Sequence, residues 1–440
     1  MKLLFVSLGC DKNLVDSEHM MGDILDAGYE ITDDEAEAEI VVVNTCCFIQ
    51  DALTESIDTI ISLGELKKTG KLKSLIITGC MAERFTSSVR EDLPEVDAVV
   101  GTNAYDSLLE AIEASLNGSK PDILKPLTGL PKDGRRVLTT GTATSYLKIA
   151  EGCNKNCSYC VIPHIRGGYR SVPMDKLLKE AEYLAEAGVS ELVLVAQETT
   201  MYGVDLYGRK SLHELVSNLC KIDGLEWIRI MYAYPEEIYD ELIDVMASEE
   251  KVCHYIDMPI QHCNNDILKR MGRRTTKEDI IKIISNLRNK IPDICIRTSI
   301  ICGFPGETLD NHNELLDFMR EVKIDHLGAF AYSQEEGTPA AEFDKQLPEV
   351  TKDSWVAEVM ELQAEISEAR NSALVGRELK VIIEGRLPDE DALVGRTYRD
   401  AASVDGYVFL DSSYEINSGE YVDVVITGCD SYDLIGEILE

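Results

Sequence analysis

The chain contains no run of apolar residues that approaches the roughly 18 needed to cross a membrane. Its apolar start, residues 1–10, is short, alternates with polar residues and has no small-residue cleavage site, so we expect neither a membrane span nor a removable leader. There is also no low-complexity tract. A composition of 45% hydrophobic and 28% charged residues is typical of a globular protein.

Positive charge is scarce. The chain has 43 Lys and Arg against 79 Asp and Glu, for a formal net charge of −36. Because phosphate backbones repel acidic proteins, this balance disfavours direct binding of nucleic acid, tRNA included, and favours a basic protein as partner. An acidic surface that serves only solubility explains the charge equally well.

Disulfide patterning is absent as well. The 13 cysteines are odd in number and show no dense pairing, and the first of them, Cys10, follows a strand-like stretch. This usage disfavours an oxidising compartment, so we expect a cytoplasmic protein. With 440 residues the chain is too long for one core and predicts two to four domains.

Cys153, Cys157 and Cys160 form a Cys-x3-Cys-x2-Cys segment. A four-iron, four-sulfur cluster takes one thiolate per iron, so three cysteines leave one iron free for a substrate or cofactor, as a catalytic metal keeps an open position. Two alternatives stay open. Three unrelated thiols at this spacing are improbable by chance, and a zinc site normally pairs Cys-x2-Cys with a second such pair.

Three segments near the start share one pattern, a short apolar run that ends in a small or polar residue and a cysteine. They are residues 3–10, 40–46 and 75–80. Such runs, separated by helical stretches at 17–27 and 52–66, are typical of buried parallel strands in an open α/β sheet. Ligands collect at the carboxyl ends of such strands, so we expect Cys10, Cys46 and Cys80 on one edge, within reach of a common metal centre. Each thiol alone is equally explained as buried and inert.

Residues 121–142 are rich in Pro, Gly and Lys and predict a linker. Beyond it, strand-like runs alternate with helical patterns. The runs are 146–151, 191–197, 227–234, 255–260, 294–302 and 326–332, and the helical patterns include 174–187, 235–247 and 277–290. Six βα repeats predict a parallel, partial (β/α)6 barrel with its chemistry at the strand carboxyl ends. The Cys153 loop follows the first strand, where a barrel places its site.

A helical pattern covers 355–374, and short strand-like pieces separated by Gly, Asp and Ser follow from Lys380 onward. This pattern favours a small five-stranded β-barrel. The predicted fold class is therefore α/β with three parts and a linker. They are an N-terminal open parallel α/β sheet domain at 1–120, the linker at 121–142, the central partial barrel at 143–372 and the C-terminal small β-barrel at 373–440.

With two cysteine triplets, a partial barrel and a terminal β-barrel in this order, the chain resembles the methylthiotransferase family of radical S-adenosylmethionine enzymes over nearly all of its length. The segments that carry the resemblance are 7–13, 15–18, 44–46, 78–80, 151–153, 303–308, 332–333 and 336–340. Within the family, Gly-Cys-Asp-Lys-Asn at 9–13 resembles the RimO branch, which modifies a ribosomal protein, more than the tRNA-modifying branch.

The resemblance implies two [4Fe-4S] clusters. Cys153, Cys157 and Cys160 would hold the one that binds S-adenosyl-L-methionine, with Tyr159 against the adenine or only shielding the cluster from water. Cys10, Cys46 and Cys80 would hold a second cluster that handles sulfur, and the terminal barrel would be a TRAM domain that contacts the macromolecular substrate. Three positions depart from the family pattern. They are Cys47 in place of Gly, for which we favour a packing role, Glu198 in place of Asp, and Val172 where a basic residue is common.

For this branch, the resemblance implies transfer of a methylthio group to the β-carbon of an aspartate in small-subunit ribosomal protein twelve, with an electron donor protein. Charge supports a basic partner independently, because residues 373–440 hold 5 Lys or Arg against 15 Asp or Glu, a net charge of −10. Two alternatives stay open. A tRNA adenosine methylthiotransferase predicts a basic groove on the terminal barrel, and a non-catalytic iron–sulfur protein predicts four protein ligands per cluster.

Other residues have two explanations each. Arg297 lies in a predicted barrel strand and is expected either to meet the cofactor carboxylate or to form a buried ion pair. Residues 303–307 predict a strand-to-helix turn, in which the glycines allow close backbone approach or only a tight turn. His164, His254 and His262 have no metal-like spacing, and we expect structural roles for them.

Overall fold

The computed structural model describes residues 1–440 except 131–134, 142, 388–391, 412–414 and 440. The chain forms two compact units. The first contains Met1–Thr139, Ala150–Val172 and Ser333–Ala341, and the second contains Thr140–Ile149, Pro173–Tyr332 and Glu342–Glu440. The domain bounds expected from the sequence stay a prediction, and within the predicted linker residues 131–134 and 142 lie outside the described residues.

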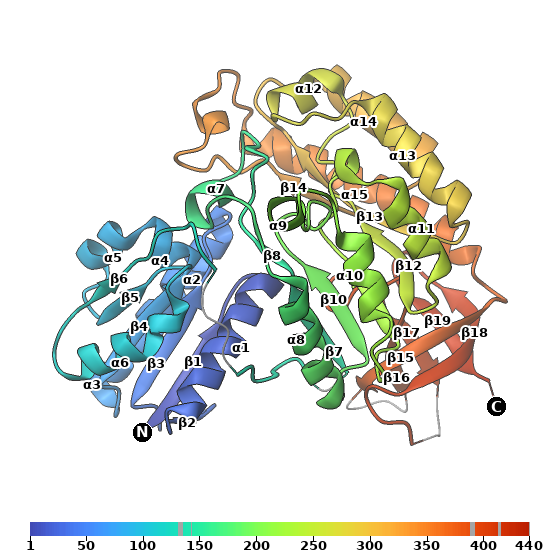
Figure 1. Ribbon diagram of the computed structural model, residues 1–440. Coiled ribbons are helices and arrows are strands. Elements are labelled where there is room, and N and C mark those ends of the chain that lie inside the picture. The colour runs from blue at the N-terminus through green and yellow to red at the C-terminus, as the bar shows by residue number, and fades with distance from the viewer. Residues whose placement is uncertain (131–134, 142, 388–391, 412–414, 440) are drawn as a thin grey trace. The chain divides into compact units, whose positions relative to one another are not determined.

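The first unit is built on a parallel sheet of six strands in the order β2-β1-β3-β4-β5-β6 (Figure 1). The strands are β1 Lys2–Ser7, β2 Glu30–Ile31, β3 Ile40–Thr45, β4 Ser74–Gly79, β5 Ala98–Val100 and β6 Asp122–Ile123. The helices are α1 Asp11–Asp26, α2 Gln50–Gly64, α3 Leu66–Thr69, α4 Cys80–Arg84, α5 Thr86–Asp92, η1 Tyr105–Ser107 and α6 Leu108–Leu116. The predicted N-terminal α/β sheet is confirmed.

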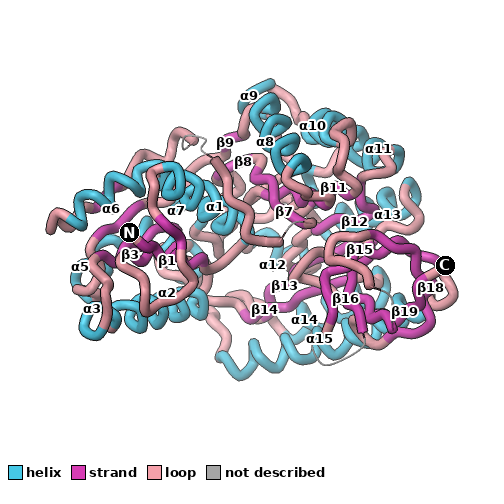
Figure 2. The backbone as a smooth tube through the Cα atoms, turned by 90° about the horizontal axis from the view of Figure 1, so that it is seen from below, coloured by secondary structure: helices cyan, strands magenta, loops and turns pink. Residues whose placement is uncertain are grey.

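Helices cover both faces of this sheet, because successive side chains of a strand point to opposite faces. Val41 and Val43 of β3 pack in one apolar cluster with residues of α2, α4 and α5, whereas Ile40 and Val42 pack in a second with α1 and α6. Figure 2 shows α1 and α6 on one side of β1 and β3, and α2 on the other. Burial on both faces explains why β3 and β4 are continuous apolar runs.

A short ribbon and a helix complete the first unit. Strands β8 Ala150–Glu151 and β9 Arg170–Ser171 pair antiparallel, and α7 Ile162–Ile165 lies between them in the chain. The predicted strand at 146–151 is therefore two strands. Its first part, β7 Thr144–Lys148, pairs in the second unit, and its last two residues pair with β9.

The second unit contains an open parallel sheet of six strands in the order β14-β13-β12-β11-β10-β7 (Figure 1). The strands are β7, β10 Glu191–Val195, β11 Trp227–Ile230, β12 Val252–Asp257, β13 Cys295–Cys302 and β14 His326–Ala331. The helices are α8 Met174–Glu186, α9 Val204–Tyr207, α10 Leu212–Leu219, η2 Pro235–Glu237, α11 Asp240–Ser248, α12 Asn265–Arg270, α13 Lys277–Lys290, α14 Leu309–Val322 and α15 Glu349–Ser372, and η3 Pro339–Glu342 spans the boundary between the units. Each strand lies beside the next in the chain, as in a partial (β/α)6 barrel.

The C-terminal part of the second unit is a closed five-stranded barrel in the order β15-β16-β17-β19-β18, as expected. The strands are β15 Glu378–Arg386, β16 Ala392–Thr397, β17 Val408–Asp411, β18 Tyr421–Cys429 and β19 Leu434–Ile438. Its core holds alternate residues of these strands, such as Val381 and Ile383. In β15 and β18 the pairing register shifts next to Gly385 and Gly428, as at the bulges that bend strands in small barrels.

Buried ion pairs fasten this barrel to the parallel sheet. Glu191, fully buried at the start of β10, lies 2.8 Å from Arg229 Nε of β11 and 2.6 Å from Arg396 Nη2 of β16. Around them, Ile382 and Ala401 of the barrel pack against Val193 and other residues of the sheet. The barrel and the sheet therefore form one unit with a shared core.

None of the helices in the described part of the chain is both long and apolar enough to cross a bilayer.

Candidate functional site

The first cysteine triplet stands at the carboxyl ends of three neighbouring strands. Cys10 precedes α1 after β1, Cys46 directly follows β3, and Cys80 begins α4 after β4. Since β1, β3 and β4 are parallel and adjacent, the structure brings the three thiols to one edge of the sheet. Cys46 and Cys80 are buried and Cys10 is exposed.

The loops that carry this triplet are in close contact. Gly9 and Gly79 each precede a cysteine with a positive φ, of 89° and 91°. A Cβ on Gly9 would lie 2.7 Å from Cys46 Cβ, and one on Gly79 would lie 2.6 Å from the Thr45 carbonyl oxygen. Glycine is therefore required at both positions to let the chain turn and the loops meet.

Asn13 ties these turns together from α1. Its Nδ2 donates to the carbonyl oxygens of Leu8 at 3.1 Å and Thr45 at 3.0 Å, while Asn44 Nδ2 donates back to the Asn13 carbonyl at 2.9 Å. Its Oδ1 lies 3.8 Å from Cys80 Sγ. A single buried amide thus touches the turns of all three cysteines.

The second triplet lies on the loop that the β8–β9 ribbon closes. Cys153 N donates to the Gly167 carbonyl at 3.1 Å, and Cys160 N donates to the Cys157 carbonyl at 3.0 Å. Cys153 and Cys157 are buried, and Cys160 is half-buried. Tyr159 lies half-buried in the turn before Cys160.

Burial and the neighbouring thiols both raise the pKa of a cysteine in each set. Burial raises the pKa of Cys80 to about 12, and negative charge on Cys10 and Cys46 raises it further against the opposing charge of Arg166. Burial likewise raises the pKa of Cys160 to about 12, with added effects from Cys157 and Cys153. Three thiolates at either place are stable together only beside a cation, and a bound metal keeps its thiols deprotonated.

The donor chemistry of each triplet, three thiols, is that of an iron–sulfur cluster ligand set. Across the described ranges, no three His, Cys, Asp or Glu side chains converge closely enough to hold a single metal ion. An iron–sulfur cluster takes its thiolates on separate irons, so its ligands stand further apart. Both sets of three thiols belong to the first unit, and their assignment to clusters stays a prediction.

Cys47 is fully enclosed in the apolar cluster that also contains Ile60 and Ile77. Burial raises the pKa of its thiol to about 12, and the charge of Cys80 adds to the shift. Its backbone carbonyl accepts from Arg84 Nη1 at 3.1 Å. These surroundings support the packing role that we favoured.

The segment Ser333–Ala341 contacts both cysteine regions, which the sequence did not indicate. Arg84, at the end of α4, bonds Glu335 Oε2 at 3.1 Å and the Glu336 carbonyl at 2.6 Å. Ala340 N donates to the Ser158 carbonyl within the Cys153 loop at 2.8 Å. The sequence analysis singled out residues 332–333 and 336–340 only because of the family resemblance. The contacts of Glu335, Glu336 and Ala340 give this segment a structural role beside both cysteine regions.

Arg166 was also missed, although its partners lie in segments that the sequence analysis had singled out. Arg166 follows α7 and is buried, with its guanidinium against Asp16, Asn13, Glu151 and the sulfur of Cys80. From the sequence alone, a charged residue in a loop is expected to be exposed. Most of the partners of Arg166 also lie far from it in the chain. Its short spacing after Cys160 is the one signal that was available.

Several other predicted residues have structural partners in the second unit. Arg297 pairs with Asp257 at 2.8 Å and with Asp405 at 3.3 Å, which is the ion-pair alternative. Glu307 Oε2 accepts from the N–H groups of Gly303 and Phe304 at 2.7 and 2.9 Å, so the 303–307 segment is a carboxylate-capped turn. The buried ring of His262 lies 3.3 Å from Glu307 Oε1.

Gly152 offers a direct test of the Cys153 loop. Its φ is +76°, and a Cβ there would lie 2.5 Å from the Gly167 carbonyl oxygen. Gly152→Ala is expected to lose ~1–2 kcal/mol for the left-handed backbone and ~1–3 kcal/mol more for the clash. Thermal unfolding of the cluster-free protein measures the loss.

Gly28→Ala is the matched control, because Gly28 has a φ of +85° with nothing within 4 Å of a Cβ. It is expected to lose only the backbone contribution and to leave iron binding unchanged. Equal losses in the two variants would show that the Gly152 contact is not tight.

Family models match three parts of the chain. The Radical SAM superfamily matches residues 147–319, the Uncharacterized protein family UPF0004 matches residues 2–101, and a TRAM domain matches residues 375–439. The three matches fall on the partial barrel with its cysteine loop, on the N-terminal sheet and on the C-terminal barrel.

Curated relatives match over the whole length. A protein of Lachnoclostridium phytofermentans named ribosomal protein uS12 methylthiotransferase RimO is 55% identical over 437 residues, which cover 99% of both chains. A protein of the same name from Clostridioides difficile is 48% identical and covers 100% of this chain and 99% of its own.

Solved structures show the same fold at low identity. The radical S-adenosylmethionine methyltransferase TsrM from Kitasatospora setae aligns with a TM-score of 0.58 at 14% identity, covering 77% of this chain and 73% of its own. The cobalamin-dependent radical enzyme OxsB aligns with a TM-score of 0.51 at 15% identity, covering 81% and 56%.

Proposed function

This chain belongs to the ribosomal protein uS12 methylthiotransferase RimO family, and on that basis we propose that it adds a methylthio group to the β-carbon of an aspartate in ribosomal protein uS12. The observation that carries the proposal is 55% identity over 99% of both chains. The relatives are named for uS12, which supports this interpretation over the tRNA alternative. The enzyme is a radical S-adenosylmethionine methylthiotransferase.

Each cysteine triplet is proposed to hold one [4Fe-4S] cluster. Cys153, Cys157 and Cys160 would hold the cluster that binds S-adenosylmethionine beside Tyr159, and Cys10, Cys46 and Cys80 would hold the second. Held there, a reduced cluster with bound S-adenosylmethionine would supply one-electron chemistry for reaction at an unactivated C–H bond. Three thiolates in each set would leave one iron of each cluster without a protein ligand.

The protein's own contribution is to position and enclose these groups. The β8–β9 ribbon and the Ala340 contact fix the Cys153 loop, and Asn13 holds the turns of the other triplet. Orientation of this kind reduces the entropy cost of bringing reacting groups together. The proposal also includes an electron donor protein and a cytoplasmic location, where uS12 is made and thiols stay reduced.

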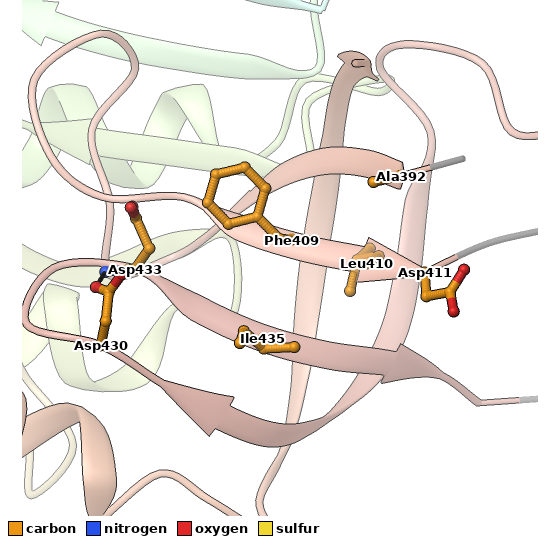
Figure 3. A pocket seen from close by; sticks show the side chains of 7 residues that line it. All are labelled: Ala392, Phe409, Leu410, Asp411, Asp430, Asp433 and Ile435. Atoms are coloured by element: carbon orange, nitrogen blue, oxygen red, sulfur yellow. Dashed lines mark hydrogen bonds between the residues drawn. The ribbon is translucent and has the colours of Figure 1, made fainter. Parts of the chain in front are cut away.

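The surface of the C-terminal barrel supports a basic substrate. A pocket of about 410 Å³ has an apolar middle and acidic ends. Figure 3 shows Phe409 and Ile435 between Asp411 at one end and Asp430 with Asp433 at the other. Burial raises the pKa of Asp433, and the nearby charge of Asp430 adds to this shift. Such a surface attracts Lys and Arg side chains and repels RNA phosphates.

The deciding experiment compares substrates. Anaerobically reconstituted protein, dithionite and S-adenosylmethionine are incubated with isolated uS12, with small ribosomal subunits and with tRNA, and each is then weighed by mass spectrometry. We expect uS12 to gain one methylthio group and tRNA to gain nothing. Cys46→Ala is the control, because it lacks a proposed ligand of the second cluster and is expected to give no gain in mass on uS12. A gain in mass on tRNA alone would refute the proposal.

A further inference from the structure

Arg166 sits between the two cysteine regions of the first unit. It follows α7, six positions after Cys160, and is only 2% exposed. Its Nη1 lies 2.7 Å from Asp16 Oδ2 and 3.3 Å from Glu151 Oε2. Its Nη2 donates to Asn13 Oδ1 and, at 3.6 Å, to Cys80 Sγ.

These contacts join three parts of the site. Asp16 and Asn13 belong to α1, which begins directly after Cys10, and Glu151 lies two positions before Cys153. One planar guanidinium therefore bonds the helix that follows Cys10, the base of the Cys153 loop and the sulfur of Cys80. Lysine has one donor centre and cannot span this set in the same way.

The guanidinium of Arg166 contacts a predicted cluster ligand as well as two carboxylates. A guanidinium keeps its positive charge in proteins, and it faces two carboxylates, both nearly inaccessible to water. The contact with Cys80 Sγ, a predicted cluster ligand, is what points to a role at the thiol.

Building on the proposed function, we propose that Arg166 is a positioning residue for the second cluster, whose positive charge at Cys80 Sγ sets the reduction potential of that cluster. Hydrogen bonds to cluster sulfurs and the charge beside them are among the factors that set such potentials. An added electron increases the negative charge beside Cys80. Arg166 stabilises that state, and Asp16 destabilises it.

The test uses the full chain with Cys153, Cys157 and Cys160 changed to alanine, so that only the second cluster is formed. The parent and its variants are titrated anaerobically with dithionite, and the midpoint potential is followed by electron paramagnetic resonance. Arg166→Gln is expected to make reduction at least tenfold less favourable, about 59 mV for a one-electron couple. Arg166→Lys keeps the charge and is expected to retain most of the potential.

Asp16→Asn separates this role from a structural one, because it removes a negative partner of Arg166 and leaves the arginine in place. We expect its midpoint potential to rise, opposite to Arg166→Gln, although both changes weaken the same ion pair and lower thermal stability. Opposite shifts support the inference. Unchanged potentials, or shifts of one sign in both variants, overturn it.

The same parent and variants also cover two cases in which a cluster does not form. If Arg166→Gln assembles no cluster, the other two variants decide. A midpoint potential that rises in Asp16→Asn and is nearly unchanged in Arg166→Lys supports the inference, and any other result overturns it. If the parent binds no cluster although its fold is intact, the ligand assignment under the proposed function fails, and the inference fails with it. A parent with a normal cluster and no response to Arg166 refutes the inference alone.

Discussion

Cys157→Ala is expected to lower the release of 5′-deoxyadenosine from S-adenosylmethionine by more than ~100-fold, whereas Cys46→Ala leaves it within a few-fold of the unmodified protein. Removing an outer partner of a metal ligand costs ~10–100-fold, and removing one of only three ligands costs more. The two triplets lie on different structural elements, so loss of one leaves the other anchored.

The measurement pairs two products. Chromatography quantifies 5′-deoxyadenosine after dithionite reduction, and mass spectrometry quantifies methylthio groups on uS12. Cys157→Ala is expected to lose both products, and Cys46→Ala only the second.

The neighbouring thiol provides the matched control. Cys47 is fully buried among apolar side chains. It is not one of the proposed ligands of the iron–sulfur clusters. Cys47→Ala is expected to keep both products and to lose only modest stability, as for a small buried side chain. Equal loss of 5′-deoxyadenosine in Cys46→Ala and Cys157→Ala would contradict the division of labour.

Glu191→Ala is expected to cost ~3–5 kcal/mol of stability, because removing one partner of a buried ion pair leaves the others uncompensated. Glu191 is the shared partner of Arg229 and Arg396, and Thr144 Oγ1 donates to it at 3.1 Å. All of these side chains are buried. The change therefore leaves two guanidinium groups without their common anion at the junction of the sheet and the C-terminal barrel.

Scanning calorimetry of the full chain measures the shift in the transition of the second unit. Glu214→Ala is the matched control, since its pair with Arg209 is exposed. Exposed pairs contribute ~0–1 kcal/mol, so little change is expected there. Similar shifts in both variants would show that Glu191 is not critical to the junction.

The pH dependence of stability gives a second measure of what the Glu191 carboxylate contributes. Burial alone raises the pKa of Glu191, but Arg396 and Arg229 outweigh it and lower the pKa from 4.5 to about 2. A lowered folded-state pKa gives stability that is present above the unfolded value and is lost as the pH falls. The contribution is therefore expected to fade between pH 4.5 and about 2, and Glu191→Gln is expected to flatten the profile in that range.

Much of the fold could be predicted because its strands are continuous apolar runs. The runs that end at Thr45 and Gly79 are strands at their predicted places, and their cysteines meet at one edge because neighbouring parallel strands end together. The helix at 17–27 begins earlier than predicted, at Asp11. Its first turns carry buried polar residues that serve the site, which hides the helical pattern.

The contacts that organise the site could not be predicted in the same way. Arg166 pairs with Asp16 across 150 positions, and Arg84 with Glu335 across 251. Local periodicity contains no information about such pairs, and charged side chains are usually exposed. The division of 146–151 into two strands has the same cause, because Glu151 finds its partner at Arg170, beyond the cysteine loop.

The arrangement around Glu191 also bears on chimaeras made by grafting the C-terminal module of one methylthiotransferase onto another to redirect its choice of substrate. Arg396 belongs to the graft and Glu191 to the recipient. A donor module without a cation at that position would leave the buried Glu191 carboxylate without one of its partners. The outcome of a swap therefore depends on the buried contact between barrel and sheet as much as on the exposed recognition surface.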